Sequence, residues 1–167
     1  TTLEWSKEPG LIYIENRKRG YQQVDLYLYD VNSKKQELLY SETSTTNIDN
    51  YNSEVVNEWG KIIITSEKDG WKQLYLLDIK SGKLSAITNG AYYVNSVLHI
   101  DKQTKDILFT ASGKEPGRNP YLLHLYRINI DKKQPVLLTP ENANHDVSVS
   151  PDGKHFADNI STLDLPT

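Results

Sequence analysis

The stretch Leu26-Tyr27-Leu28-Tyr29-Asp30-Val31 recurs twice further along this chain. It returns as Leu74-Tyr75-Leu76-Leu77-Asp78-Ile79 after 48 residues, and as Leu125-Tyr126-Arg127-Ile128-Asn129-Ile130 after a further 51. A polar turn follows each copy, and a second apolar stretch ends ten residues after the Asp or Asn, with no insertion in any copy. Each repeat is therefore predicted to contain a β-hairpin of fixed length.

Two more apolar runs precede each hairpin and bring the expected strands to four per copy. The nearer runs are Leu11–Ile14, Ile62–Thr65 and Ile107–Thr110, and the weaker, earlier runs are Leu3–Trp5, Glu54–Val56 and Val94–Ile100. A last, partial copy opens at Val147–Val149, turns at Ser150–Gly153 and continues through Lys154–Asn159. The sequence thus holds three complete copies and about half of a fourth.

Four antiparallel strands in each ~40–50-residue repeat are typical of a β-propeller blade, whereas a helical solenoid would space its apolar residues by about 3.6. The sequence predicts an all-β fold, a partial β-propeller of about three and a half four-stranded antiparallel blades, at 1–40, 53–88, 94–139 and, in part, 146–167. A β-sandwich is the alternative. Closed propellers have about four to eight blades, so residues 1–167 are expected to be one propeller segment of a longer protein, with strand edges that favour association.

Composition limits the partners of this segment. Its 19 Lys and Arg residues are outnumbered by 22 Asp and Glu, which gives a formal net charge of −3. A basic face that could neutralise a phosphate backbone is not expected, so nucleic acid is excluded as a partner. No apolar run approaches the roughly 20 residues of a membrane-spanning helix, which predicts no membrane span in this segment. The absence of cysteine excludes disulfides, thiolate zinc sites and a cysteine nucleophile.

No catalytic, metal-binding or cofactor-binding residue is predicted, and no cofactor is expected. The sequence lacks the Gly-x-Ser-x-Gly elbow that exposes a nucleophilic serine. The histidines, His99, His124, His145 and His155, lack the spacings that direct two ligands to one metal. His99 and His124 fall within apolar strands and are expected to be structural.

Three local patterns suggest chemistry but have simpler interpretations. Asn144-His145-Asp146 could be a base with its orienting carboxylate, but neighbours on a strand point to opposite faces, so a turn entering the last copy is preferred. Gly113–Gly117 lacks the Gly-Lys-Ser/Thr ending of a phosphate loop, and a strand connection is predicted. The basic cluster Arg17–Arg19 is expected to be a solvated hairpin tip, with contact to an acidic partner as the alternative.

Two features remain that could contact a ligand. Ser41–Ser53 is the longest stretch without apolar periodicity, and long connections on a rigid scaffold often carry binding residues. This loop is the candidate ligand-facing segment, and a plain crossover between blades is the other interpretation. Tyr27, Tyr75 and Tyr126 share one repeat position; they are expected to pack between sheets with their hydroxyls on rim partners, an aromatic ligand ladder being the alternative.

The chain contains, in this order, the segments Glu67–Leu76 (EKDGWKQLYL), Glu115–Tyr121 (EPGRNPY), Ser150–Lys154 (SPDGK) and Asp158–Ser161 (DNIS), followed by Pro166. In this order and spacing they resemble the N-terminal β-propeller of bacterial dipeptidyl peptidase IV-like serine peptidases of the prolyl oligopeptidase clan. One departure stands out, because the family often carries an aromatic residue, typically Trp, where this chain reads Thr46–Tyr51.

The resemblance implies an eight-bladed propeller followed by an α/β-hydrolase domain, with this segment among the last blades. It implies a periplasmic or extracellular serine exopeptidase that releases N-terminal dipeptides with proline or alanine second, its propeller gating peptide substrates. A homodimer is left open. The family's amine-binding Glu pair has no counterpart here, and this segment alone is expected to have no peptidase activity. The alternatives are a non-catalytic interaction scaffold and an acylaminoacyl or prolyl tripeptidyl peptidase.

Overall fold

The Asp or Asn that ends the recurring stretch organises the turn after it. Its side-chain oxygen accepts a backbone N–H two or three residues further on: Asp30 from Asn32 at 2.8 Å, Asp78 from Ser81 at 2.8 Å, and Asn129 from Asp131 at 3.1 Å. Such bonds imitate a backbone turn, which a short carboxylate or amide side chain is able to make. The repeated acid or amide therefore fixes where each hairpin reverses.

The computed structural model describes residues 1–162. Pro166 and the end of the partial copy at 146–167 lie outside the described residues. The chain divides into two units, one of residues 1–70 with 75–85 and one of residues 71–74 with those from 86 onward. Each unit has a hydrophobic core of its own.

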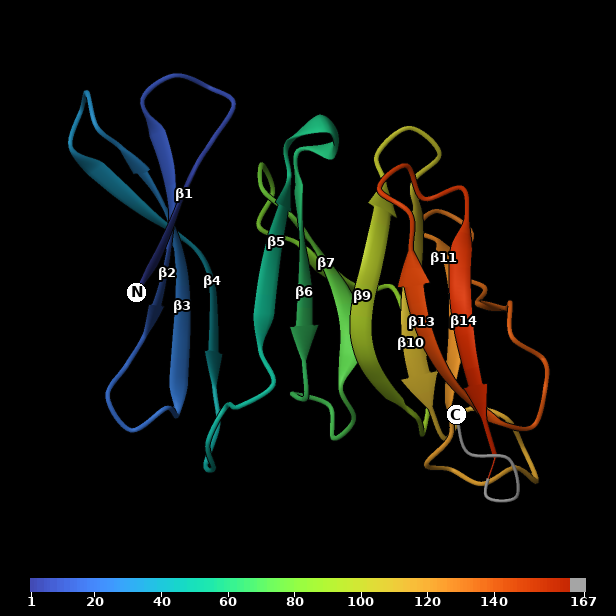
Figure 1. Ribbon diagram of the computed structural model, residues 1–167. Helices are drawn as coiled ribbons and strands as arrows, with labels where there is room; N and C mark the ends of the chain where they lie inside the picture. The colour runs from blue at the N-terminus through green and yellow to red at the C-terminus, as the bar shows by residue number, and fades with distance from the viewer. Residues whose placement is uncertain (163–167) are drawn as a thin grey trace. The chain divides into compact units, whose positions relative to one another are not determined.

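The first two sheets follow the order of the chain. The first consists of β1 (Thr2–Trp5), β2 (Leu11–Arg17), β3 (Gln23–Asp30) and β4 (Lys35–Thr43), all paired antiparallel. The second consists of β5 (Asn52–Val56), β6 (Lys61–Ser66), β7 (Gln73–Asp78) and β8 (Leu84–Ala86). A single 3-10 turn, η1 (Asn57–Trp59), joins β5 to β6 where a tight turn was expected. Figure 1 draws the strands of the first sheet in blue.

The remaining strands make a third sheet and a hairpin. β9 (Tyr93–Asp101), β10 (Asp106–Ser112), β11 (Leu123–Asn129) and β12 (Val136–Leu137) form a four-stranded sheet in the order β12-β11-β10-β9. β13 (Asn144–Val149) pairs antiparallel with β14 (Phe156–Ser161), the strands drawn in orange and red in Figure 1. The all-β prediction is confirmed, as are four strands in each complete copy and two in the partial one.

Alternation along the strands builds the core of the first unit. Tyr13, Leu26 and Leu39 of the first sheet point to the same cluster as Ile64 and Leu77 of the second, and all five are less than 9% exposed. In the second unit, the Phe109 and Tyr126 rings stack at 5.5 Å with an interplanar angle of 24°. The inner strands β6, β7 and β10 are buried along consecutive residues, so both of their faces are covered.

A left-handed residue stands before the second strand of each copy. Gly10, Gly60 and Lys105 have φ angles of 84°, 60° and 63°. Their carbonyls accept the backbone N–H groups of Val31, Ile79 and Ile130 at 2.9, 3.1 and 3.1 Å. Glycine adopts this conformation without steric cost, whereas Lys105 adopts it at some cost in the third copy. This bond ties the start of each second strand to the end of the third.

The prediction of a turn at Asn144-His145-Asp146 is wrong, because all three residues lie within β13. The argument that His145 and Asp146 point to opposite faces of the strand, and so do not form a catalytic pair, is confirmed. His145 is fully buried and Asp146 is exposed, since neighbours on a strand face opposite sides. The segment is a paired strand because its alternation continues into Val147 and Val149 and matches β14.

Candidate functional site

The predicted ligand-facing loop is shorter in the structure than in the sequence pattern. β4 continues to Thr43 and β5 begins at Asn52, so the irregular part comprises residues 44–51. Its backbone is fixed to the hairpin between β2 and β3. Ser44 N–H donates to the Gln22 carbonyl at 3.0 Å and Ile48 N–H to the Tyr21 carbonyl at 2.7 Å. The loop is therefore an ordered crossover with defined anchor points.

Arg17 holds this loop from the end of β2. Its Nη2 donates to the Tyr51 carbonyl at 2.7 Å and its Nη1 to the Ile48 carbonyl at 3.4 Å. The guanidinium carbon also lies 5.7 Å from the centre of the Tyr51 ring, within the range of a cation–π contact. The prediction that Arg17–Arg19 is simply a solvated hairpin tip is wrong for Arg17, because its carbonyl partners lie more than 30 residues away and leave no local pattern.

Tyr51 is the buried end of the loop. Its side chain is 4% exposed, and its ring stacks on that of Tyr40 at 6.4 Å with an interplanar angle of 11°. Burial and the nearby carboxylates of Glu15 and Glu42 raise the pKa of its hydroxyl well above the ordinary value. Among residues 1–162 that hydroxyl has no hydrogen-bond partner. Tyr51 therefore anchors the loop by packing and stays protonated.

A second buried group, the Glu42 carboxylate, lies on β4 just before the loop. Glu42 is 7% exposed and accepts hydrogen bonds from the Tyr40 and Ser66 hydroxyls, both at 2.8 Å. Burial and this bond to Glu42 raise the pKa of Tyr40. The bonds join β4 to the end of β6. They place a carboxylate at the base of the loop with two of its acceptor positions occupied.

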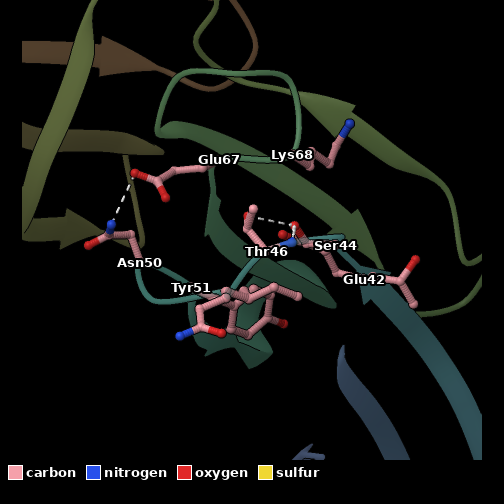
Figure 2. Close-up of a pocket in the computed structure, with 10 residues that line it drawn as sticks. Glu42, Ser44, Thr46, Asn50, Tyr51, Glu67 and Lys68 are labelled. Carbon is pink, nitrogen blue, oxygen red and sulfur yellow. Dashed lines mark hydrogen bonds between the residues drawn. The ribbon is translucent and has the colours of Figure 1, made fainter. Parts of the chain in front are cut away.

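Between these anchors the loop encloses a small polar hollow of about 140 Å³. Figure 2 shows its lining, in which Asn50 Nδ2 donates to Glu67 Oε1 at 3.0 Å and the Ser44 and Thr46 hydroxyls lie 3.2 Å apart. Lys68 lines the hollow but its ammonium is engaged elsewhere, 2.8 Å from Asp69 Oδ2 and 4.7 Å from the centre of the Tyr75 ring. Hydroxyls, amides and two carboxylates suit a ligand that donates hydrogen bonds.

The sequence profile described as the dipeptidyl peptidase IV (DPP IV) N-terminal region matches residues 1–167. This chain belongs to that family. Dipeptidyl peptidase 4 of the fungus Arthroderma otae is 30% identical over 93 residues, which are 54% of this chain and 12% of that protein. The chain therefore spans about one eighth of the length of this curated relative.

Solved structures of bacterial proteins give the same fold as this DPP IV N-terminal region. Dipeptidyl peptidase 4 of Porphyromonas gingivalis superposes with a TM-score of 0.74 at 17% identity, over 93% of this chain and 22% of that chain. A Bacteroides ovatus protein provisionally described as a dipeptidyl aminopeptidase IV superposes with a TM-score of 0.76 at 18% identity, over 97% and 26%. The predicted partial β-propeller and the resemblance to this family are both confirmed.

Two histidines of this DPP IV N-terminal region, His124 and His145, are buried and hydrogen-bonded in structural positions. His124 is 2% exposed, with Nδ1 3.0 Å from the Thr139 carbonyl, and burial lowers its pKa. His145 Nδ1 lies 2.7 Å from Asp158 Oδ2 and its Nε2 lies 3.1 Å from the Glu141 carbonyl. The His124 and His145 rings are 5.1 Å apart. The structural interpretation of His124 is confirmed, and the acid that holds His145 is Asp158 and not its neighbour Asp146.

The three tyrosines that share one repeat position each place their hydroxyl beside a carboxylate. Tyr75 and Tyr126 are buried, and their hydroxyls donate to Asp69 and Glu115 at 2.9 Å each. Tyr27 is half-buried and its hydroxyl lies 3.3 Å from Asp25.

Within the described range 1–162 there is no group of three or more His, Asp or Glu side chains that could hold a metal ion. Nor does that range contain a helix long and apolar enough to cross a membrane.

Proposed function

We propose that this chain is the non-catalytic propeller segment of a DPP IV-like serine exopeptidase that removes N-terminal dipeptides with proline or alanine second. The match of the family profile to residues 1–167 carries the proposal. The nucleophile is proposed to lie in an α/β-hydrolase domain of the parent protein, as the resemblance implies, and the lack of a Gly-x-Ser-x-Gly elbow in this sequence supports that proposal. The propeller gates the access of peptides to that domain.

Within this role the loop of residues 44–51 is the peptide-facing part. Its hollow presents acceptor groups from Glu42 and Glu67 and small hydroxyls from Ser44 and Thr46. Peptide N–H groups are donors that such a surface binds. Arg17 and Tyr51 keep the loop in place, so that its contacts are formed before the peptide arrives.

The proposal extends to the arrangement and setting of the parent. Residues 1–40, 53–88, 94–139 and 146–167 are its blade limits, supported by the three four-stranded sheets and the β13–β14 hairpin. The parent acts in the periplasm or outside a bacterial cell, as the resemblance implies, and its assembly, with a homodimer as one option, is left open. Its partners are peptide substrates and its own hydrolase domain.

The first test uses the chain by itself. Purified residues 1–167 are expected to release no chromophore from a proline dipeptide anilide, because the sequence lacks the Gly-x-Ser-x-Gly elbow that exposes a nucleophilic serine. Activity that persists through a second purification step, and that a serine-directed inhibitor removes, would overturn the non-catalytic assignment.

The second test uses the longer parent enzyme and the loop. Glu67→Gln is expected to raise KM for a dipeptide substrate about threefold with kcat unchanged, because it weakens binding that is equal in ground and transition states. Glu37→Gln, on the exposed face of β4, is the matched control and should leave both constants unchanged. An unchanged KM in the loop variant would remove the loop from the substrate path.

Two alternatives remain distinguishable by the parent's substrate. An acylaminoacyl or prolyl tripeptidyl peptidase would cleave blocked or tripeptide substrates in preference to free dipeptides. A non-catalytic interaction scaffold would show no hydrolysis in any form of the parent. Either result would replace the exopeptidase proposal while leaving the fold assignment intact.

A further inference from the structure

A second pocket lies in the unit formed by residues 71–74 and those from 86 onward, remote in sequence from the loop of residues 44–51. It has a volume of about 410 Å³ and is lined by Thr88, Asn89, Tyr92, Lys114, Lys133 and Pro135 among others. Pockets of about 300–1,000 Å³ are the size that small organic ligands occupy. The two lysines come from different turns, one after β10 and one between β11 and β12.

Lys114 presents its ammonium between two aromatic rings. Its Nζ lies 5.7 Å from the centre of the Tyr92 ring and 5.7 Å from that of Tyr126. These contacts hold the side chain without neutralising its charge. The nearby Glu115 carboxylate accepts the Tyr126 hydroxyl at 2.9 Å and is not part of the lining.

Lys133 supplies the second positive charge. Its backbone is left-handed, with φ of 56°, at the turn position that Gly82 occupies in the preceding copy with φ of 67°. Its Nζ donates to the Ala86 carbonyl at 2.8 Å, which leaves two ammonium hydrogens for other acceptors. Across residues 1–162 neither Lys114 nor Lys133 forms an ion pair with a carboxylate.

The rest of the lining is apolar or neutral and contains no acid. Tyr92 is 5% exposed and offers its ring, and Pro135 offers a second flat apolar surface. Asn89 is exposed at the rim and adds an amide. An inorganic oxyanion would fill only a small part of about 410 Å³ and would leave the apolar surfaces uncovered. A cation is excluded by the two ammonium groups.

We propose that this pocket binds an organic carboxylate, with the carboxylate between Lys114 and Lys133 and an apolar body against Tyr92 and Pro135. The carboxylate accepts hydrogen bonds from both ammonium groups, and such charge-assisted bonds are the strong ones. The site does not depend on the proposed peptidase function, because none of its residues belongs to the loop of residues 44–51.

Benzoate is the probe, titrated into the isotope-labelled full chain while backbone amide signals are followed by NMR. Benzoate is expected to shift the amides of Thr88–Tyr92 and Gly113–Glu115 to saturation, and added salt should weaken the binding. Benzyl alcohol, the neutral analogue, and inorganic phosphate should each bind at least threefold more weakly. Equal binding of the alcohol would overturn the role of the lysines, and equal binding of phosphate would overturn the need for an apolar body.

Substitution of each lysine tests whether its positive charge contributes to benzoate binding. Lys114→Gln and Lys133→Gln should each weaken benzoate binding about threefold, the size expected of a partly exposed ion pair. Lys132→Gln, which changes the neighbouring exposed lysine outside the lining, should leave it unchanged. Lys133→Gln is independent of the aromatic contacts of Lys114 and so remains informative if Lys114→Gln folds poorly. No saturable shift in the unaltered chain, or equal weakening by Lys132→Gln, would refute the site.

Discussion

The Arg17 guanidinium donates a hydrogen bond to the Tyr51 carbonyl at 2.7 Å, across 34 residues of sequence. A side chain of the first sheet thereby fixes the backbone that leads into the second. The same guanidinium lies over the Tyr51 ring at 5.7 Å. The loop of residues 44–51 is thus fixed by the Arg17 guanidinium at the end of β2 and by burial of the Tyr51 ring.

Removing the Arg17 guanidinium should favour local opening of the loop of residues 44–51 before it destabilises the first unit as a whole. Arg17→Ala is expected to lower the free energy of local opening by about 1.5–3 kcal/mol, the usual contribution of a charged hydrogen bond. The backbone amides of residues 44–52 should then exchange their hydrogens faster, in proportion to the lost free energy.

Arg19→Ala is the matched control for this prediction. Arg19 lies two residues on in the same basic cluster and is exposed. Its removal should leave exchange in the loop unchanged. Equal acceleration in the two variants would mean that general charge at the hairpin, and not the carbonyl bonds of Arg17, holds the loop.

Asp25 makes the first sheet sensitive to acid. It is 2% exposed and accepts hydrogen bonds from Ser41 at 2.7 Å and Gln23 at 2.8 Å, with Lys18 at 3.6 Å. Burial alone would raise its pKa, but the Ser41 and Gln23 bonds and the Lys18 charge outweigh burial and lower it below 3.8. Because the folded pKa is depressed, its stabilisation is complete above pH 3.8 and is lost as pH falls through the folded value.

Asp25→Asn should therefore lower the unfolding free energy at neutral pH by about 1–3 kcal/mol and flatten its acid dependence. Chemical denaturation at a series of pH values measures both effects. Glu37→Gln, an exposed carboxylate on β4, should change neither. A variant that retains the full acid dependence would show that another carboxylate is responsible.

The His145–Asp158 pair gives a third prediction, in the other unit. Asp158 Oδ2 accepts from His145 Nδ1 at 2.7 Å, and the histidine is fully buried. Asp158→Asn replaces the carboxylate acceptor of this hydrogen bond with a neutral amide, so it is expected to cost about 1.5–3 kcal/mol, the usual contribution of a hydrogen bond to a charged group. Asp146→Asn, beside His145 in sequence but exposed, should change the unfolding free energy by less than about 0.5 kcal/mol. Thermal melts of the two variants at pH 7 test the difference.

The sequence predicts those features whose causes are local, and misses those whose causes are not. The hairpins follow from Asp30, Asp78 and Asn129, because the turn bond joins residues two or three apart. The partner of His145 could be found only from the register, in which His145 faces Ile160 and Asp158 lies two residues before it. The role of Arg17 depends on tertiary contact and has no sequence pattern.

One face of the first sheet carries a partly exposed apolar row that crosses all four strands. The register aligns Leu3, Ile14, Tyr27 and Leu38, and the next row begins with Trp5. Leu3, Leu38 and Trp5 are 64%, 53% and 66% exposed. Ile14 and Tyr27 of this row have Ile64 and Tyr75 as their repeat counterparts in the second sheet, and these two are buried in the core of the first unit. The repeat thus places residues at these positions that suit burial.

The chain on its own is therefore expected to self-associate through this face. Trp5→Lys with Leu38→Lys should shift the sedimentation coefficient toward that of a monomer, because lysines on both rows oppose the burial of a shared apolar surface. Tyr121→Lys, which replaces an aromatic side chain that is 86% exposed and outside these rows, is the control and should leave association unchanged. Sedimentation velocity over a range of concentrations measures the effect. A monomeric chain before substitution, or an equal shift with Tyr121→Lys, would show that this face drives no association.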